Sequence, residues 1–218
     1  MDINKIGGIE RIRFMTSHPK DLSNELINCY ATLDKLCPHL HLPVQSGSNK
    51  VLREMNRNYT REDYLKIITK LKELVPDISI TTDIIIGFPG ETEEDFNDTL
   101  ELVKEVRFDS AFTFLYSIRE GTKAARMENQ IDEKVKHDRF QRLTDTLNEI
   151  GLELNQRLVG EILEVLVEEV SKNNAEVLTG RTRTNKLVHF RGNKELIGST
   201  VNVRIENVKT FTLEGSIV

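Results

Sequence analysis

One stretch, residues 83–92 (DIIIGFPGET), constrains the fold of this chain more than any other. Its run of isoleucines is typical of a buried β-strand, which a Gly-Phe-Pro-Gly turn ends abruptly. Thr92 then has the position of a helix N-cap, with Asp95 three residues on as in a capping box. A strand that leads straight into a helix predicts a parallel α/β sheet with its ligand at the carboxyl ends of the strands. Such turns are also often purely structural, so the motif alone leaves a ligand role open.

The same strand-and-loop unit recurs over the first 128 residues. Strands are predicted over 9–15, 39–44, 78–88 and 111–116, and helices after the N-cap residues Ser23, Thr60 and Thr92. This alternation predicts a parallel sheet or partial barrel with right-handed crossovers. Polar residues gather where the strands end, namely His18, Gln45, Ser46, Glu91, Tyr116 and Arg119. We expect this edge to be the functional one.

The pattern changes after residue 128. Asp132 is placed to cap a long helix whose apolar residues recur every three or four positions up to Leu158. Beyond Gly160 the sequence predicts five short strands, over 163–167, 175–178, 187–190, 200–205 and 213–218. Five short strands broken by Gly and Asn predict a small barrel of the oligonucleotide-binding type. We therefore divide the chain into domains at 1–151 and 152–218.

A basic stretch without acidic residues lies inside this second domain. It contains Arg181, Arg183, Lys186, His189, Arg191 and Lys194, with Phe190 among them. Cations for phosphates and a ring for stacking are what a groove for single-stranded RNA requires. The alternative interpretation is a solvated basic hairpin.

Composition limits the functional classes. The net charge of −5 argues against a chain that binds nucleic acid over its whole surface. No apolar run reaches the roughly 18 residues of a membrane span, and the first residues lack the apolar core of a signal peptide, so we expect a cytoplasmic protein. Cys29 and Cys37 match neither a Cys-x-x-Cys site nor a disulfide framework, and we expect both to be buried thiols.

Several longer segments together resemble one known family. Residues 41–48 (HLPVQSGS), 51–60, 81–92 and 116–122 resemble the radical S-adenosylmethionine methylthiotransferases. Residues 11–19 and 180–186 (GRTRTNK) are most similar to the branch of that family that acts on tRNA. The resemblance covers essentially the whole chain.

The resemblance implies a fold, an activity and partners. The fold would be a partial parallel, TIM-like radical-SAM barrel followed by a TRAM domain, a small all-β barrel of OB type. The activity would be transfer of a methylthio group to N6-isopentenyladenosine beside the anticodon of tRNA, with S-adenosylmethionine and [4Fe–4S] clusters as cofactors. Neither a membrane nor DNA is expected as a partner.

One family motif is missing from this sequence. The Cys-x-x-x-Cys-x-x-Cys loop that holds the cluster does not occur, and two cysteines do not supply three cluster ligands. The resemblance suggests that the chain starts inside the barrel, near its third strand. We therefore expect the chain to be inactive alone, and we assign no catalytic residue.

The family's cofactor pocket is carried over only in part. Gln45 and Ser46 would bind the ribose or methionyl end of S-adenosylmethionine, and the backbone at Gly87 would lie along the adenine. In the family pattern Gly-x-Ile-x-Gly-x-x-Glu only Ile85 and Gly87 align, because Asp83 replaces the first glycine and Glu91 falls one residue late. Arg119 would bind the cofactor carboxylate, bind an RNA phosphate, or pack against its loop.

Other interpretations stay open. For His18, His39 and His41 we favour hydrogen bonding at the barrel rim over metal binding, because no third ligand is recognisable. The chain could be an RNA-binding module without catalysis. It could also be an unrelated barrel enzyme that uses His18 or His41 with Asp83, although this would leave the RNA-like ending unexplained.

Overall fold

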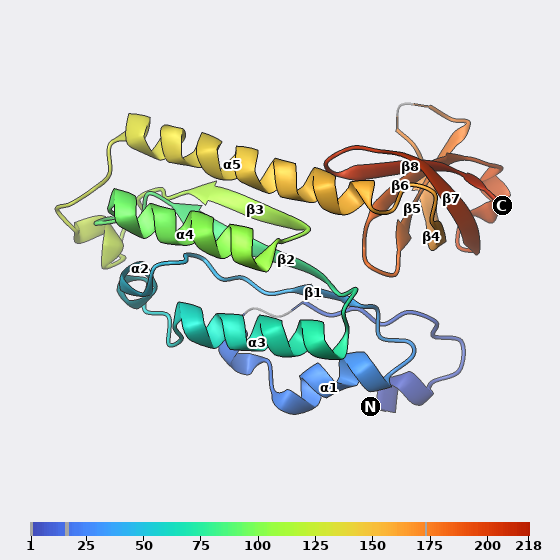
Figure 1. The fold of residues 1–218 in the computed structure, drawn as a ribbon, viewed down its shortest axis with the longest axis horizontal. Coiled ribbons are helices and arrows are strands. Elements are labelled where there is room, and N and C mark those ends of the chain that lie inside the picture. The colour runs from blue at the N-terminus through green and yellow to red at the C-terminus, as the bar shows by residue number, and fades with distance from the viewer. Residues whose placement is uncertain (1, 16–17, 173) are drawn as a thin grey trace.

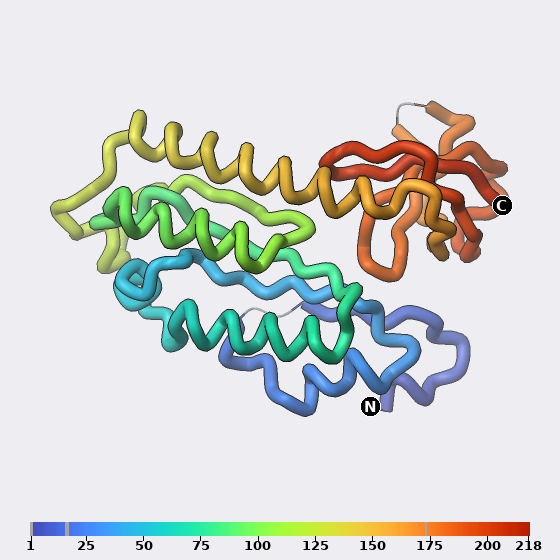
Figure 2. The backbone as a smooth tube through the Cα atoms, in the orientation of Figure 1, coloured from blue at the N-terminus to red at the C-terminus, as the bar shows by residue number. Residues whose placement is uncertain are grey.

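A helix-covered sheet and a small β-barrel lie side by side in the computed structural model, which describes residues 2–15, 18–172 and 174–218 (Figures 1 and 2). The sheet part contains α1 (Asn24–Thr32), β1 (His39–His41), α2 (Asn49–Glu54), α3 (Arg61–Leu74), β2 (Ser79–Ile86), α4 (Glu93–Val106) and β3 (Ser110–Leu115). The long helix α5 (Glu133–Gln156) leads to the barrel strands β4 (Ile162–Val170), β5 (Val177–Thr182), β6 (Leu187–Arg191), β7 (Thr200–Val208) and β8 (Thr212–Ile217). Short 3-10 helices cover Asp2–Lys5, Pro19–Asp21, Ala124–Arg126 and Lys194–Leu196.

The sheet is parallel, in the order β1-β2-β3. One face is buried against α1, α3, α4 and α5 around a core that includes Leu40, Ile84 and Phe96. The strand predicted over 9–15 was wrong as a continuous strand, since only Ile12 and Met15 form isolated bridges there. No helix in the described part of the chain covers the other face, which we call the open face. It carries alternate side chains of the strands, including His39, His41, Thr81, Asp83, Phe112 and Phe114.

Helix starts follow the capping signals of the sequence. The hydroxyls of Thr60 and Thr92 each close a capping box with the aspartate three residues on, and Ser23 and Asp132 cap α1 and α5. Helix α2 was not predicted, because six residues are too few to show a helical period.

The second part is a closed barrel in the order β4-β5-β6-β8-β7. Its five strands confirm the number predicted from sequence. Val165, Leu178, Val188, Phe190 and Leu213 fill its interior and are at most 2% exposed. Helix α5 passes without a break through residue 151, where we place the domain boundary, so the boundary itself stays a prediction.

The barrel docks on the sheet through its β5–β6 hairpin. The Nζ of Lys186 lies 2.6 Å from Oδ1 of Asp109, just before β3, and donates to Oδ1 of Asn155 on α5 at 2.9 Å. Arg183 donates to the carbonyl oxygens of Asp34 and Leu36. Charged side chains of the hairpin therefore attach it to the edge of the sheet where the strands begin.

The sheet part also reaches towards the hairpin. Arg11 donates to the carbonyl oxygen of Arg181 at 2.7 Å, and Arg13 donates to that of Thr182 at 2.5 Å. Asn155 donates to the carbonyl oxygens of Lys209 and Thr210. Because these bonds run in both directions, the docking uses backbone oxygens as well as the Lys186–Asp109 ion pair.

The turn after β2 is closed from one side by α5. Gly87 has φ +76°, a conformation that side chains other than glycine rarely adopt, and a Cβ there would overlap Cγ of Lys136. Lys136 is 4% exposed and is held by the Tyr116 carbonyl oxygen and Glu133. The turn therefore requires glycine for two independent reasons.

Replacing Gly87 by alanine is expected to destabilise the sheet part more than the matched change Gly121→Ala. Gly121 has φ +82° but open space around it, so its change costs only the backbone conformation, about 1–2 kcal/mol. Gly87→Ala adds the overlap with Lys136, about 1–3 kcal/mol more. Urea unfolding followed by circular dichroism measures both, and equal losses would mean that Lys136 does not restrict the turn.

Replacing Lys186 by methionine is expected to loosen the docked hairpin. The Asp109 side chain is only 17% exposed and would lose its cationic partner. We expect a loss of about 2 kcal/mol in the free energy of unfolding, which is less than the ~3–5 kcal/mol for breaking a fully buried pair. Amide hydrogen exchange of residues 182–187 should rise. Lys209→Met is the control, because its pair with Glu214 is exposed and lies within the barrel. Unchanged exchange in Lys186→Met would show that docking does not depend on this ion pair.

Candidate functional site

The carboxyl edge of the sheet brings Gln45 next to β2. The backbone amide of Gln45 donates to the Asp83 carbonyl oxygen at 2.8 Å, and the backbone amide of Ile85 donates to the backbone carbonyl oxygen of Gln45 at 2.9 Å. Gln45 is buried at 7% exposure and has φ 71°, which is strained for a residue other than glycine. Its side-chain amide has no hydrogen bond among the residues that the structure describes. A strained, buried residue with a free amide fits a contact to a ligand at this edge.

Ser46 faces into the protein rather than towards the open face. Its hydroxyl lies 3.4 Å from Oγ1 of Thr99 on α4 and accepts a hydrogen bond from the Ser48 amide at 3.2 Å. Its exposure is 1%. Ser46 therefore ties its loop to α4 here, and a cofactor contact stays a prediction.

The side chain of Glu91 is bonded to the turn after β2. Its carboxylate accepts hydrogen bonds from the Gly87 amide at 3.2 and 3.3 Å and from Nη1 of Arg139 at 2.9 Å. Burial raises the pKa of Glu91, while the Gly87 amide and Arg139 oppose that rise. These two partners account for the Glu91 side chain, which favours a structural role. Sequence reasoning missed Arg139 because it lies 48 residues further along the chain.

The remaining residues of the expected cofactor set differ in their surroundings. Ile85 is half-buried on the open face, in register with Phe114. Arg119 is exposed in the segment after β3. Among the described residues its one hydrogen-bonding partner is Thr122, which donates to the Arg119 carbonyl oxygen. The structure thus brings Gln45, Ile85 and Gly87 together through β2 and leaves Arg119 in a surface loop.

A row of polar side chains crosses the open face, which sequence reasoning noticed only as separate histidines. Oγ1 of Thr81 lies 3.0 Å from Nδ1 of His41 and 3.3 Å from Nε2 of His39. Nε2 of His41 lies 3.4 Å from Oδ1 of Asp83. Burial, with the charge of Arg13 nearby, lowers the pKa of His39 to about 4, so this imidazole is neutral at neutral pH. Both histidines therefore lie on one face and are hydrogen-bonded.

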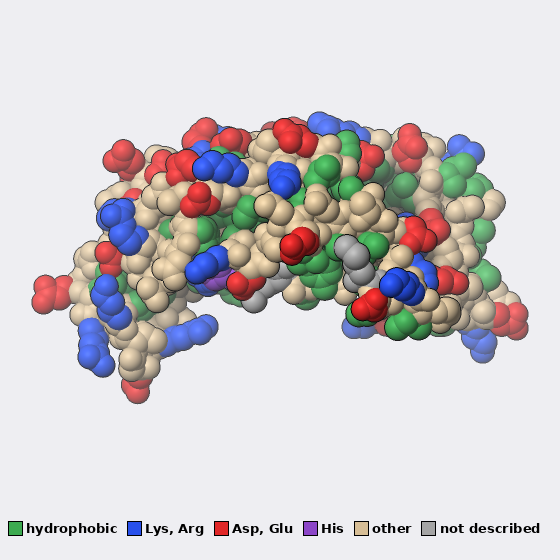
Figure 3. Space-filling model, turned by 90° about the horizontal axis from the view of Figure 1, so that it is seen from below, with side chains coloured by type: hydrophobic (Ala, Val, Ile, Leu, Met, Phe, Trp, Pro, Cys, Tyr) green, Lys and Arg blue, Asp and Glu red, His purple; other side chains and the backbone are tan. Residues whose placement is uncertain are grey.

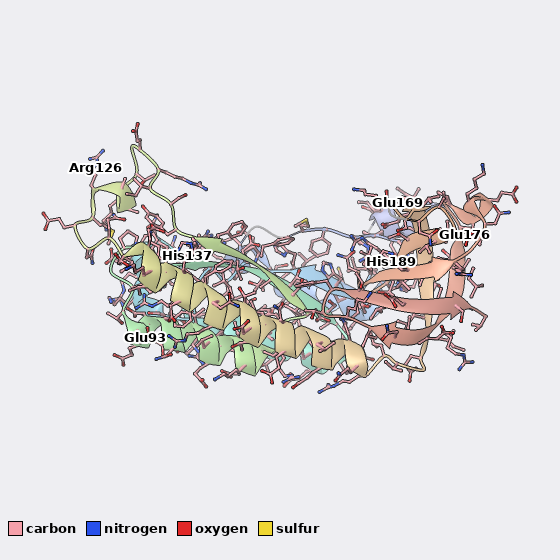
Figure 4. The ribbon with its side chains drawn as sticks, turned by 90° about the horizontal axis from the view of Figure 1, so that it is seen from above. Glu93, Arg126, His137, Glu169, Glu176 and His189 are labelled. Carbon is pink, nitrogen blue, oxygen red and sulfur yellow. The ribbon has the colours of Figure 1, made fainter. Side chains whose placement is uncertain are left out.

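The expected RNA-binding residues fall into two groups. Arg183 and Lys186 face the sheet, and Arg181 donates to the Asn185 carbonyl oxygen and lies 3.4 Å from Glu168. On the barrel itself, Arg191 and Lys194 are exposed, and His189 is hydrogen-bonded to Thr179. Figure 4 places His189 on the barrel and Arg126, near the carboxyl edge, at the other end of the molecule.

The face of the molecule drawn in Figure 3 has no large, purely basic surface. Lysine and arginine side chains are interspersed with aspartate and glutamate over most of the face drawn there. On this face, a contact with nucleic acid would therefore depend on local clusters of cations.

The residues present do not fit an iron–sulfur cluster. Cys29 and Cys37 are free and buried, as expected. Among the described residues no three histidine, cysteine or acidic side chains are grouped as metal ligands. Within the same described part, no helix is long and apolar enough to cross a membrane.

Comparison with known families finds one match in each part of the chain. Residues 2–103 match the Radical SAM superfamily, and residues 156–218 match the TRAM domain. The fold class expected from sequence, a partial radical-SAM barrel followed by a TRAM barrel, is thereby confirmed.

Curated relatives and a solved structure point the same way. The chain is 62% identical over 216 residues to tRNA-2-methylthio-N(6)-dimethylallyladenosine synthase of Alkaliphilus oremlandii, covering 99% of this chain and 46% of that protein. It is 60% identical to the protein of that name from Acetivibrio thermocellus, covering 100% of this chain and 45% of the relative. The chain thus spans about half the length of these relatives.

Among solved structures, coproporphyrinogen III oxidase of Escherichia coli, described as a radical SAM enzyme, shares the fold with a TM-score of 0.54. Its sequence identity is 17%, covering 79% of this chain and 46% of that one. The two family matches and the high identity to these synthases agree with the sequence segments that carry the resemblance. The chain therefore contains a Radical SAM segment followed by a TRAM domain, and over almost its whole length it is similar to these synthases.

Proposed function

We propose that this chain is part of a tRNA methylthiotransferase that modifies N6-isopentenyladenosine beside the anticodon. The observation that carries the proposal is 62% identity along 99% of the chain to a synthase named for this nucleoside. Because the chain matches 46% of that relative, the remaining half must supply whatever these residues lack. The two buried cysteines make the cluster ligands the most obvious of these missing groups.

The carboxyl edge is the part of this chain that suits S-adenosylmethionine. Bound with a cluster, this cofactor supplies radical chemistry. The side-chain amide of Gln45 would hydrogen-bond its ribose or methionyl end, and the open face at Ile85 and the Gly87 backbone would lie along the adenine. Arg119, exposed beyond β3, is available for the cofactor carboxylate or an RNA phosphate.

The TRAM domain would hold the tRNA. Of the expected RNA-binding residues, Arg191 and Lys194 are exposed on the barrel and are free to contact phosphates. Phosphate contacts position an RNA without reading its sequence. Choosing the adenosine would then depend on the carboxyl edge, where the reacting base must meet the cofactor.

A chimera tests the proposed activity. In the Alkaliphilus oremlandii relative, the matching segment is replaced by this chain, and the chimera is expressed in a strain that lacks the enzyme. Methylthiolated nucleoside in the tRNA digest should reach within about tenfold of the parent's level, equivalent to about 1.4 kcal/mol of transition-state stabilisation. This chain alone is the control and should give none. A folded chimera without product would contradict the proposed activity.

A binding titration tests the TRAM assignment separately. The full chain should bind tRNA, and the logarithm of its affinity should fall linearly with the logarithm of salt concentration. Arg191→Ala with Lys194→Ala should reduce that slope by about 1.4–1.8, a little under one per lost contact. Lys66→Ala with Lys104→Ala removes the same charge from α3 and α4 and should change nothing. Overlapping curves for all three proteins would exclude this face of the barrel.

A further inference from the structure

A cleft of about 580 Å³ separates the open face of the sheet from the barrel. This volume lies within the range of about 300–1,000 Å³ that is usual for ligand sites. Both parts of the chain form its walls, because Phe112 belongs to β3 whereas Lys186 and Phe211 belong to the barrel. We call it the interdomain cleft.

Two phenylalanines from different parts of the chain line this cleft and are exposed to solvent. Phe112 on β3 is 60% exposed, and Phe211, in the turn before β8, is 68% exposed. Neither ring is needed to fill a core, since both lie outside the two buried clusters. Exposed aromatic rings on both sides of a cleft are suited to stacking against flat ligands.

The charged lining of the cleft is mainly cationic. Arg13, Arg181 and Lys186 line it, and Asp109 is the acidic residue there, already paired with Lys186. Nη2 of Arg13 donates to the Thr182 carbonyl oxygen. The Arg181 side chain lies 3.4 Å from Oε2 of Glu168 and is 38% exposed. The cationic lining contrasts with the chain as a whole, whose net charge is −5. A ligand with negative charge and flat apolar surfaces complements this lining.

We propose that the interdomain cleft binds a single-stranded segment of RNA, with its phosphates at Arg13 and Arg181 and its bases against Phe112 and Phe211. The inference rests on the proposed function and deepens it, because it gives the tRNA a path between the two domains. Only unpaired bases expose the faces that such stacking needs, so a loop suits the cleft better than a duplex.

The docked hairpin explains why the cleft keeps its shape. Lys186 and Arg183 attach the hairpin to the sheet, and Arg13 is bonded to the same hairpin. The cations therefore stand at fixed positions before RNA arrives, which reduces the cost of ordering them on binding.

The test measures binding of the full chain to a fluorescein-labelled, single-stranded oligoribonucleotide of about 10 nucleotides, within the ~4–16 of one OB-type site. Phe211→Ala should weaken binding at least about fivefold, equivalent to about 1 kcal/mol for one lost stacking contact. Phe114→Ala is the matched control: Phe114 is 50% exposed on the same open face but does not line the cleft. The affinity of Phe114→Ala should stay within about twofold of wild type, a smaller change than the loss of one stacking contact would cause.

A second variant distinguishes a lost stacking contact from a folding defect in Phe211→Ala. The chain has no tryptophan, so Phe211→Trp introduces a single indole that retains a stacking surface. Phe211→Trp should bind with wild-type affinity, and its fluorescence should be quenched by the oligonucleotide but less by a duplex of equal length. An indole that is not quenched, or equal affinities for Phe211→Ala and Phe114→Ala, would overturn the cleft assignment.

The same titrations separate this inference from the proposed function. If wild type binds tRNA and the oligonucleotide but Phe211→Ala does so equally well, the RNA lies elsewhere on the TRAM domain and only the cleft assignment fails. If wild type binds neither RNA at any salt concentration, the proposed tRNA contact of this chain fails with it.

Discussion

The docking of the β5–β6 hairpin on the sheet is the contact on which the rest of the arrangement depends. The Lys186–Asp109 pair, at 2.6 Å, is reinforced by Asn155, which belongs to the helix that links the two parts. Hydrogen bonds from Arg11 and Arg183 run in opposite directions across the same junction. A connecting helix alone would leave the barrel free to swing, whereas these bonds fix where its cations and rings face.

The two candidate sites consequently lie at opposite ends of one sheet. The cofactor edge lies where the strands end, at Gln45 and Gly87, and the interdomain cleft lies where they begin, beside Asp109. Thr81 on β2, at the cleft, and Gly87 just after β2, at the cofactor edge, are six positions apart, which correspond to about 20 Å. The open face, with its polar row from His39 to Asp83, connects the two ends, and a bound RNA that reaches both would have to cross it.

The turn after β2 shows how packing and a candidate function share the same residues. Gly87 is required because Lys136 covers it, and Glu91 is held by the Gly87 amide and Arg139. These contacts explain the glycine and the glutamate without any ligand. Gln45 differs, because its strained backbone and free amide have no such structural explanation.

Local order was readable from sequence, since caps and strand periods depend on neighbouring residues: Thr60, Thr92 and Asp132 start helices as predicted, and five strands close the barrel. The resemblance likewise predicted the Radical SAM and TRAM matches. Tertiary structure alone decided which cations are available to bind RNA. Arg183 and Lys186 were predicted to bind RNA, but they bond to residues of the sheet part that lie about 150 and 77 positions away along the chain. It also decided that Phe112 and Phe211 share one cleft. Pairing over such separations depends on how the domains meet, which no local pattern encodes.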